Sequence, residues 1–206
     1  MSGSARFSVL SRVLHWLMAV LVLAMLLIGI AMVGSLADYH RLVAIHKPIG
    51  IAILVLVAIR LVNRLVSPPP PLPEHMPAWQ RSAAKGSHVL LYILMFALPL
   101  VGWGMLSAAR YPIPLFGNVL LPPILPQDAA LYAGLRALHT WLAFLLFATF
   151  LAHLGAALLH ALIHRDGVFQ SMASWGAAKE RRDDRDDGPP SDVPSTRDPG
   201  APPLIT

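Results

Sequence analysis

Apolar residues run along this chain in four long blocks, separated by shorter segments that carry proline, glycine and charged residues. The first block contains Leu17–Val33 without a single charge. A helix rises about 1.5 Å per residue, so about 20 residues cross the roughly 30 Å of hydrocarbon in a bilayer. Each block is long enough, and the pattern predicts transmembrane helices near Val13–Leu36, Val43–Leu65, Ser87–Ala108 and Tyr132–Ile163.

The interruptions between the blocks predict where helices end. The proline tract Pro68–Pro73 stops the second helix, because proline has no backbone N–H to donate. The segment Tyr111–Gln127 is too rich in proline to span a membrane and is predicted to pack as an interfacial loop. From residue 176 onward, acidic, basic, proline and serine residues alternate, which is typical of disorder. We therefore predict a four-helix domain over residues 1–172 and a disordered tail over residues 173–206.

Composition places the chain in the membrane and restricts its chemistry. Of 206 residues, 56% are hydrophobic and 13% are charged, whereas a soluble domain has about a quarter charged residues. The chain has no cysteine, so disulfides, iron–sulfur clusters and thiolate chemistry are excluded. Any redox centre must be held by nitrogen or thioether ligands. The net charge of +5 comes from basic residues that flank the spans, so we expect no nucleic-acid partner.

The basic residues also predict an orientation. With four spans, both termini lie on one side of the membrane. That side holds every lysine and arginine except four, which are Arg41, Lys47, Arg110 and Arg136. Loops rich in lysine and arginine stay in the cytoplasm, so we predict an all-α, four-helix transmembrane bundle with both termini cytoplasmic.

Histidines lie where metal ligands would be useful. His139 and His153 are fourteen residues apart on one face of the fourth helix, about 21 Å along its axis. An imidazole that faces lipid is costly, so these rings are expected to point into the bundle. His15 and His46 begin the first two helices on opposite sides of the membrane. The depths predict an outer pair, His46 with His139, and an inner pair, His15 with His153, which suits bis-histidine ligation of two b haems.

Other interpretations of the same histidines remain open. The imidazoles can simply form hydrogen bonds between helices, and zinc is a weaker alternative because each depth offers two nitrogens and no nearby carboxylate. His160 lies seven residues after His153 on nearly the same face, and by depth it matches His15 at least as well. If His160 is not the ligand, it is a candidate for a quinone site or for a contact behind the inner ligand. His88 opens the third helix on the inner side. It is either a group beside the inner centre, for example at a quinone site, or a boundary histidine that faces water.

Several cations are candidates for pairing with haem propionates. Arg60 lies at the inner depth, and Lys47 and Arg136 lie at the outer depth. Carboxylates in a site of low dielectric constant need a charged partner. Lipid head groups are the alternative partner for each of these cations.

These residues together resemble the bacterial cytochrome b561 family. The resemblance covers about residues 6–172, including the proline-rich segment after the second helix. Each motif alone is weak, and their order and spacing make the match specific. The motifs are Arg12-Val-Leu-His15-Trp16, Ile45-His46-Lys47-x-x-Gly50 with Arg60 fourteen positions after His46, Ala97-Leu98-Pro99-x-x-Gly102, and Leu138-His139-Thr-Trp141 followed by His153.

The resemblance implies a four-helix bundle with two non-covalently bound b haems. It also implies that the iron ligands are His15, His46, His139 and His153, which selects His153 over His160 by analogy. Members of the family exchange electrons with the quinone pool, and some are thought to take an electron from superoxide on the periplasmic side. Related membrane cytochromes serve as subunits of hydrogenases or other dehydrogenases.

Three functions are therefore compatible with the sequence. The first is a multi-pass cytochrome of the bacterial inner membrane that transfers electrons between a periplasmic-side donor, such as superoxide, and ubiquinone or another quinone. As an enzyme it would be a superoxide:quinone oxidoreductase, and the sequence assigns no separate catalytic residue. The second is a membrane-anchoring cytochrome b subunit that serves a separate redox partner protein. The third is a haem-free transporter or scaffold, which would be colourless.

Overall fold

The computed structural model describes residues 7–71, 76–115 and 119–173. Within these ranges every named element is helical, and the one β-bridge joins Pro114 to Leu120. Four helices are long and apolar enough to cross a membrane, which confirms the predicted all-α membrane bundle. They are α1 (Val9–Gly34), α2 (Tyr39–Val66), α3 (Ala78–Ala108) and α4 (Ala129–Leu159), and α4 continues into a π-helical turn, η1 (His160–His164), before the short α5 (Val168–Ala173).

The helices extend further into polar sequence than the apolar blocks predicted. α3 begins at Ala78 rather than near Ser87, and α2 begins at Tyr39 rather than near Val43. Helical hydrogen bonding does not need apolar side chains, so a helix continues past the hydrocarbon where its residues favour it, as Ala83 and Ala84 do. Ser8 and Asp128 cap the first turns of α1 and α4 by accepting hydrogen bonds from backbone N–H groups. The predicted tail lies outside the described residues apart from its first residue, Ala173.

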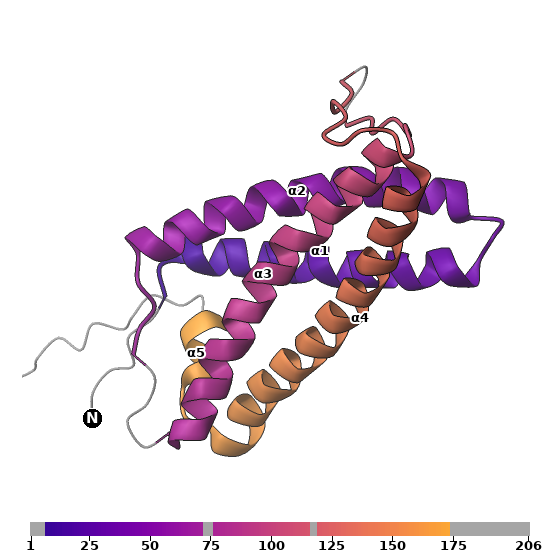
Figure 1. Ribbon diagram of the computed structural model, residues 1–206. Coiled ribbons are helices and arrows are strands. Elements are labelled where there is room, and N and C mark those ends of the chain that lie inside the picture. The colour runs from indigo at the N-terminus through magenta and orange to yellow at the C-terminus, as the bar shows by residue number, and fades with distance from the viewer. Residues whose placement is uncertain (1–6, 72–75, 116–118, 174–206) are drawn as a thin grey trace, which may run out of the picture. The chain divides into compact units, whose positions relative to one another are not determined.

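The four helices form two antiparallel pairs (Figure 1). α1 packs along α2, α3 packs along α4, and α2 also contacts α3. Close backbone approaches between α4 and either α1 or α2 are few. The core where the pairs meet is made by six apolar side chains, which are Val22, Leu26, Ile53, Leu94, Leu98 and Leu146. The bundle therefore has a packed centre, and α4 makes few close backbone approaches to the first pair.

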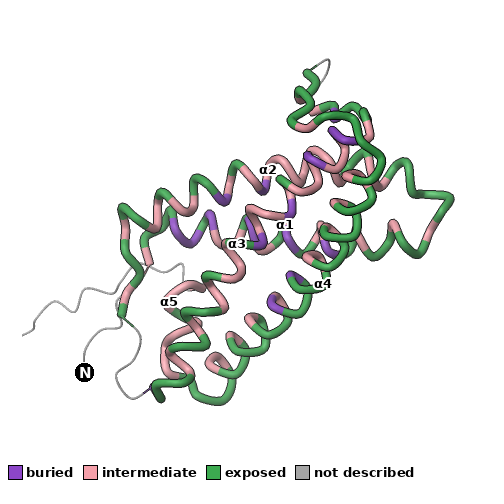
Figure 2. Tube along the Cα trace, in the orientation of Figure 1, coloured by how far each residue is buried: buried purple, intermediate pink, exposed green. Residues whose placement is uncertain are grey.

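Burial follows one stripe on each helix. On α1 the buried apolar residues Leu14, Met18, Val22 and Leu26 recur every four residues and share one face. The rest of the surface is apolar as well: Val20, Leu27 and Ile30 are more than half exposed. Figure 2 shows buried positions at intervals along the helices, with exposed positions on their other sides. In a bilayer this exposed apolar surface contacts acyl chains.

The described residues between α3 and α4, 109–115 and 119–128, form a non-helical segment that packs on the bundle, while its predicted interfacial position stays a prediction. The indole Nε1 of Trp103 donates to the carbonyl of Pro122, and the backbone N–H of Ile124 donates to the hydroxyl of Ser107. Gly104 leaves room for Leu125: a Cβ at position 104 would lie 2.9 Å from the Cδ1 atom of that leucine. These contacts hold the loop against the end of the bundle that carries His46 and His139.

Candidate functional site

Two imidazoles meet at the end of the bundle that is covered by the α3–α4 loop. His46, from the second turn of α2, and His139, from the third turn of α4, have ring centres 6.2 Å apart and ring planes inclined by 65°. The Nδ1 atoms of both rings are buried and make no hydrogen bond of ordinary length and angle. An unsatisfied buried polar group costs about 1–3 kcal/mol, so a pair of them marks a place with another purpose than packing.

A second pair meets at the opposite end. His15 from α1 and His153 from α4 have ring centres 6.3 Å apart and planes inclined by 69°. His88, from α3, joins them, with its ring centre 5.3 Å from that of His153. This end therefore gathers three imidazoles from three helices.

The two pairs fit a metal-centred macrocycle. A bond between a metal and an imidazole nitrogen is about 2 Å long, and each ring centre lies about 1 Å beyond its nitrogen, so rings on opposite sides of one iron have centres about 6 Å apart. Both observed separations have this value. Inclined ring planes are compatible with two imidazoles that share one iron, because each ring could rotate about its iron–nitrogen bond. Among the described residues no three histidine or acidic groups are arranged to hold a metal ion alone, and each pair would offer two imidazole nitrogens to a haem iron.

The helix packing is compatible with such a group. The axial pairs join α4 to α1 and α4 to α2, and these are the helices with few close backbone approaches to α4. A flat ring between two imidazoles requires this kind of separation, because its width lies across the interface. The residues present therefore fit a b haem at each end.

His160 is engaged elsewhere. Its Nδ1 donates to the Asp166 carboxylate at 2.6 Å, across the turn that ends α4. That turn closes with the backbone N–H of Arg165 donating to the carbonyl of His160, while Arg165 adopts the left-handed conformation with φ 50°. Burial by itself raises the pKa of Asp166, but hydrogen bonds from His160 and from the backbone N–H of Val168 outweigh it. The pKa of this carboxyl therefore lies below its usual 3.8.

This ion pair predicts a pH-dependent stability of the segment that contains it. Because the folded-state pKa of Asp166 is lowered, its stabilising contribution is fully present above pH 3.8 and is lost as the pH falls through the lowered value. We expect Asp166→Asn to speed hydrogen–deuterium exchange of residues 160–173 at neutral pH. The difference from the unaltered protein should shrink under strongly acidic conditions. Equal exchange of both proteins at neutral pH would show that the pair does not hold the segment.

The predicted inner cation, Arg60, lies beside the inner imidazoles. Its Nε donates to the hydroxyl of Tyr92 at 3.0 Å, and its charge acts on His15, His88 and His153. The guanidinium carbons of Arg60 and Arg64 both lie 5.9 Å from the centre of the Tyr92 ring. Among the described residues no carboxylate pairs with either arginine. This end thus offers two guanidinium groups to an anionic ligand.

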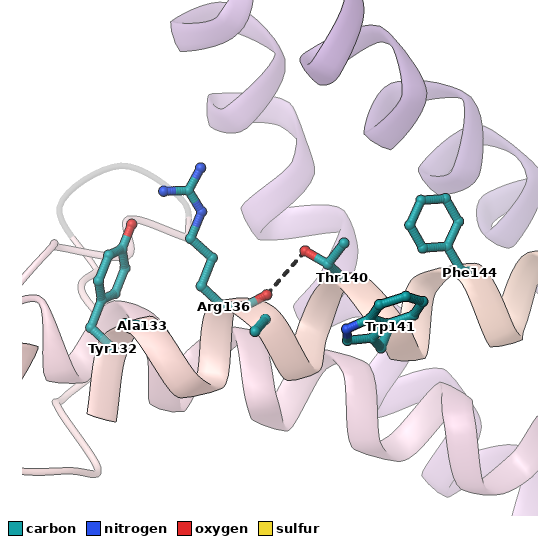
Figure 3. Close-up of a pocket in the computed structure, with 7 residues that line it drawn as sticks. Tyr132, Ala133, Arg136, Thr140, Trp141 and Phe144 are labelled. Atoms are coloured by element: carbon teal, nitrogen blue, oxygen red, sulfur yellow. Dashed lines mark hydrogen bonds between the residues drawn. The ribbon is translucent and has the colours of Figure 1, made fainter. Parts of the chain in front are cut away.

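The predicted outer cations, Lys47 and Arg136, have no charge interaction with the outer imidazoles like that of Arg60 at the inner end. Lys47 donates from Nζ to the carbonyl of Pro112 in the α3–α4 loop, at 3.2 Å. Arg136 lines an open groove of about 440 Å³ along one face of α4, together with Tyr132, Thr140, Trp141 and Phe144 (Figure 3). None of the histidines lines this groove. The structure therefore places Arg136 on the helix of His139 but turned toward a separate surface.

Sequence reasoning missed two features of the inner end. Tyr92 holds Arg60, and it lies four residues after His88 on the same helix face, a spacing that pointed to it. Asn63 donates from Nδ2 to the hydroxyl of Ser11 at 2.7 Å and so ties α2 to α1. No local pattern indicates that contact, because the partners are far apart in sequence.

Comparison with known proteins identifies the family of this chain. A family model described as prokaryotic cytochrome b561 matches residues 6–175. Cytochrome b561 homolog 2 of Escherichia coli K12 is 37% identical over 171 residues, covering 81% of this chain and 90% of that protein. Cytochrome b561 homolog 1 of the same organism is 31% identical, covering 81% and 96%. A probable superoxide oxidase, CybB, of Yersinia pestis is 31% identical over 169 residues, covering 81% and 95%.

The family match spans all four long helices, and those helices are long and apolar enough to cross a membrane. The chain therefore belongs to the prokaryotic cytochrome b561 family, and it is a multi-pass, b-haem electron-transfer cytochrome of the bacterial inner membrane.

Proposed function

We propose that this cytochrome carries electrons across the inner membrane, from a periplasmic donor to a quinone, with two b haems per chain. The ligands are His46 with His139 at the periplasmic end and His15 with His153 at the cytoplasmic end. The concentration of lysine and arginine at the end with both termini supports this orientation. When bound, b haem supplies reversible one-electron chemistry, while the protein sets its position and surroundings.

One observation carries the proposal: two imidazole pairs, at opposite ends of the bundle, have nearly equal ring separations of 6.2 and 6.3 Å. α4 contributes one ring to each pair. Because His139 and His153 are fourteen residues apart on one continuous helix, their spacing of about 21 Å is rigid. The engagement of His160 by Asp166 supports His153 as the inner ligand.

Other side chains near the two imidazole pairs would help to hold the haems. Arg60 and Arg64 lack a carboxylate partner among the described residues and lie at the inner end, where they can bind haem propionates. Tyr92 fixes Arg60 in place through its hydroxyl. At the outer end, the α3–α4 loop contains the buried Ile113 and accepts a hydrogen bond from Lys47, so it packs against α2 next to His46.

Superoxide is the donor that we favour. The Yersinia pestis relative is named as a probable superoxide oxidase. The outer segments here carry Arg41, Lys47, Arg110 and Arg136 against Asp38 and Asp128, and a positive surface attracts a small anion. Superoxide loses one electron and becomes dioxygen. Two such electrons with two protons convert a quinone to its quinol.

The test supplies enzymatically generated superoxide and a short-chain ubiquinone to the purified, haem-loaded protein. We expect quinol formation whose rate falls steeply as ionic strength rises, because salt screens the attraction. His46→Ala should abolish the reaction, and His40→Ala, which changes an exposed histidine on the same helix, should not. If dithionite reduces the protein but superoxide does not at any salt concentration, the donor is wrong. Co-purification of a stoichiometric soluble dehydrogenase would then favour the anchoring-subunit function.

A further inference from the structure

Gly102, on α3, lies against the imidazole of His139, which belongs to the outer pair. A Cβ added to this glycine would lie 3.3 Å from Cε1 and 3.5 Å from Nδ1 of His139. The first distance is tighter than an ordinary van der Waals contact between such atoms, so one edge of the ring rests on the bare backbone of α3. Other glycines differ: a Cβ at Gly134 or Gly155, both on α4, would meet nothing within 4 Å.

The same contact brings the ring to a backbone acceptor. Leu98 precedes Gly102 by one helical turn, and its backbone interacts with the His139 imidazole. A carbonyl oxygen has two lone pairs, so it can accept from a helical N–H and from a second donor. The buried Nδ1 of His139 makes no hydrogen bond of ordinary length and angle with a described residue, so the Leu98 carbonyl is the acceptor open to it. A side chain at position 102 would push the ring away from this acceptor.

We infer that Gly102 is a positioning residue for His139: its missing side chain seats the imidazole against α3, with Nδ1 facing the Leu98 carbonyl and Nε2 left for the iron. This inference rests on the proposed role of His139 as an axial ligand. Histidines that bind metals almost always donate their second ring nitrogen to a fixed acceptor, which sets both the tautomer and the ring orientation. The Leu98 carbonyl supplies that acceptor from the backbone, and Gly102 leaves the space for the ring to approach it. No polar side chain has to be buried for this purpose.

The test compares Gly102→Ala with Gly134→Ala, each in a His15→Ala background that retains the outer haem alone. Alanine in place of glycine inside a helix is by itself stabilising, so a loss in either variant must come from a contact. For Gly102→Ala we expect haem to dissociate about 10- to 100-fold faster, as when other acceptors behind a metal ligand are removed. We also expect a shifted midpoint potential and a changed low-spin EPR signal. Gly134→Ala should match the background in all three measurements.

The outcomes separate this inference from the proposed function. If the background protein holds one haem and Gly102→Ala leaves its dissociation, potential and EPR signal unchanged, the inference is wrong and the ligand assignment stands. If the background protein holds no haem at the outer site, both are wrong.

A measurement without any change at position 102 covers the case in which that variant does not accumulate. In the reduced protein with ¹⁵N-labelled histidine, the Nδ1–H of His139 should be visible by NMR and slow to exchange with D₂O. Its signal is assigned by its loss in His139→Ala. An Nδ1–H that exchanges rapidly, or an Nδ1 that carries no proton, would overturn the inference.

Discussion

Replacing His139 with alanine is expected to halve the haem content of the purified protein, from two haems per chain to one. The centre of its ring lies 6.2 Å from that of His46, and without it the proposed outer iron would keep a single protein ligand. The inner pair is about 21 Å away along α4 and should keep its haem. Haem extraction and quantification against protein concentration measures the effect, and the reduced spectrum identifies the haem that remains.

The control is His40→Ala, which removes an exposed histidine from α2 without touching either pair. His46→Ala should reproduce the result of His139→Ala, because each removes half of the same site. If either variant retains both haems with an unchanged reduced spectrum, the outer pairing is incorrect.

The second large effect separates His153 from His160. We expect His153→Ala to lose the inner haem, since its ring is the one 6.3 Å from His15. His160→Ala should retain both haems, because that imidazole is bound to Asp166 at the end of α4. The measurement is again the haem-to-protein ratio, together with the low-spin EPR signals of the two centres.

His88 needs its own control in this comparison. Its ring centre lies 5.3 Å from that of His153, so it is near enough to replace the missing ligand. The double variant His153→Ala/His88→Ala removes that substitute and should hold a single haem. Retention of two haems by the double variant, or loss of a haem in His160→Ala, would contradict the assignment of His153.

The sequence predicted the helices well, because a bilayer imposes a length and a composition that a chain of 206 residues can satisfy in few ways. Helix ends were less predictable. α3 begins at Ala78, outside the apolar block, since its first turns depend on helix propensity and not on hydrophobicity. The left-handed turn at Arg165 and the π-helical turn before it have no clear local pattern either.

For the site, helical spacing and depth predicted which histidines lie together, but not the finer contacts between helices. His139 and His153 are fourteen residues apart, and helical periodicity alone places them on one face of α4. The choice between His153 and His160 depends on where Asp166 returns after the turn, which periodicity does not describe. The contact between His139 and Gly102 likewise depends on how α3 packs against α4, which the sequence does not give. A glycine in a helix indicates a close approach but does not identify the group that makes it.

In the proposed function, imidazoles from separate helices meet around iron at both ends of the bundle. A potentiometric titration of the purified, unaltered protein, with haem quantified on the same sample, tests it most directly. We expect two b haems per chain that titrate as two low-spin centres. A colourless protein, or one that binds a single haem per chain, would contradict it.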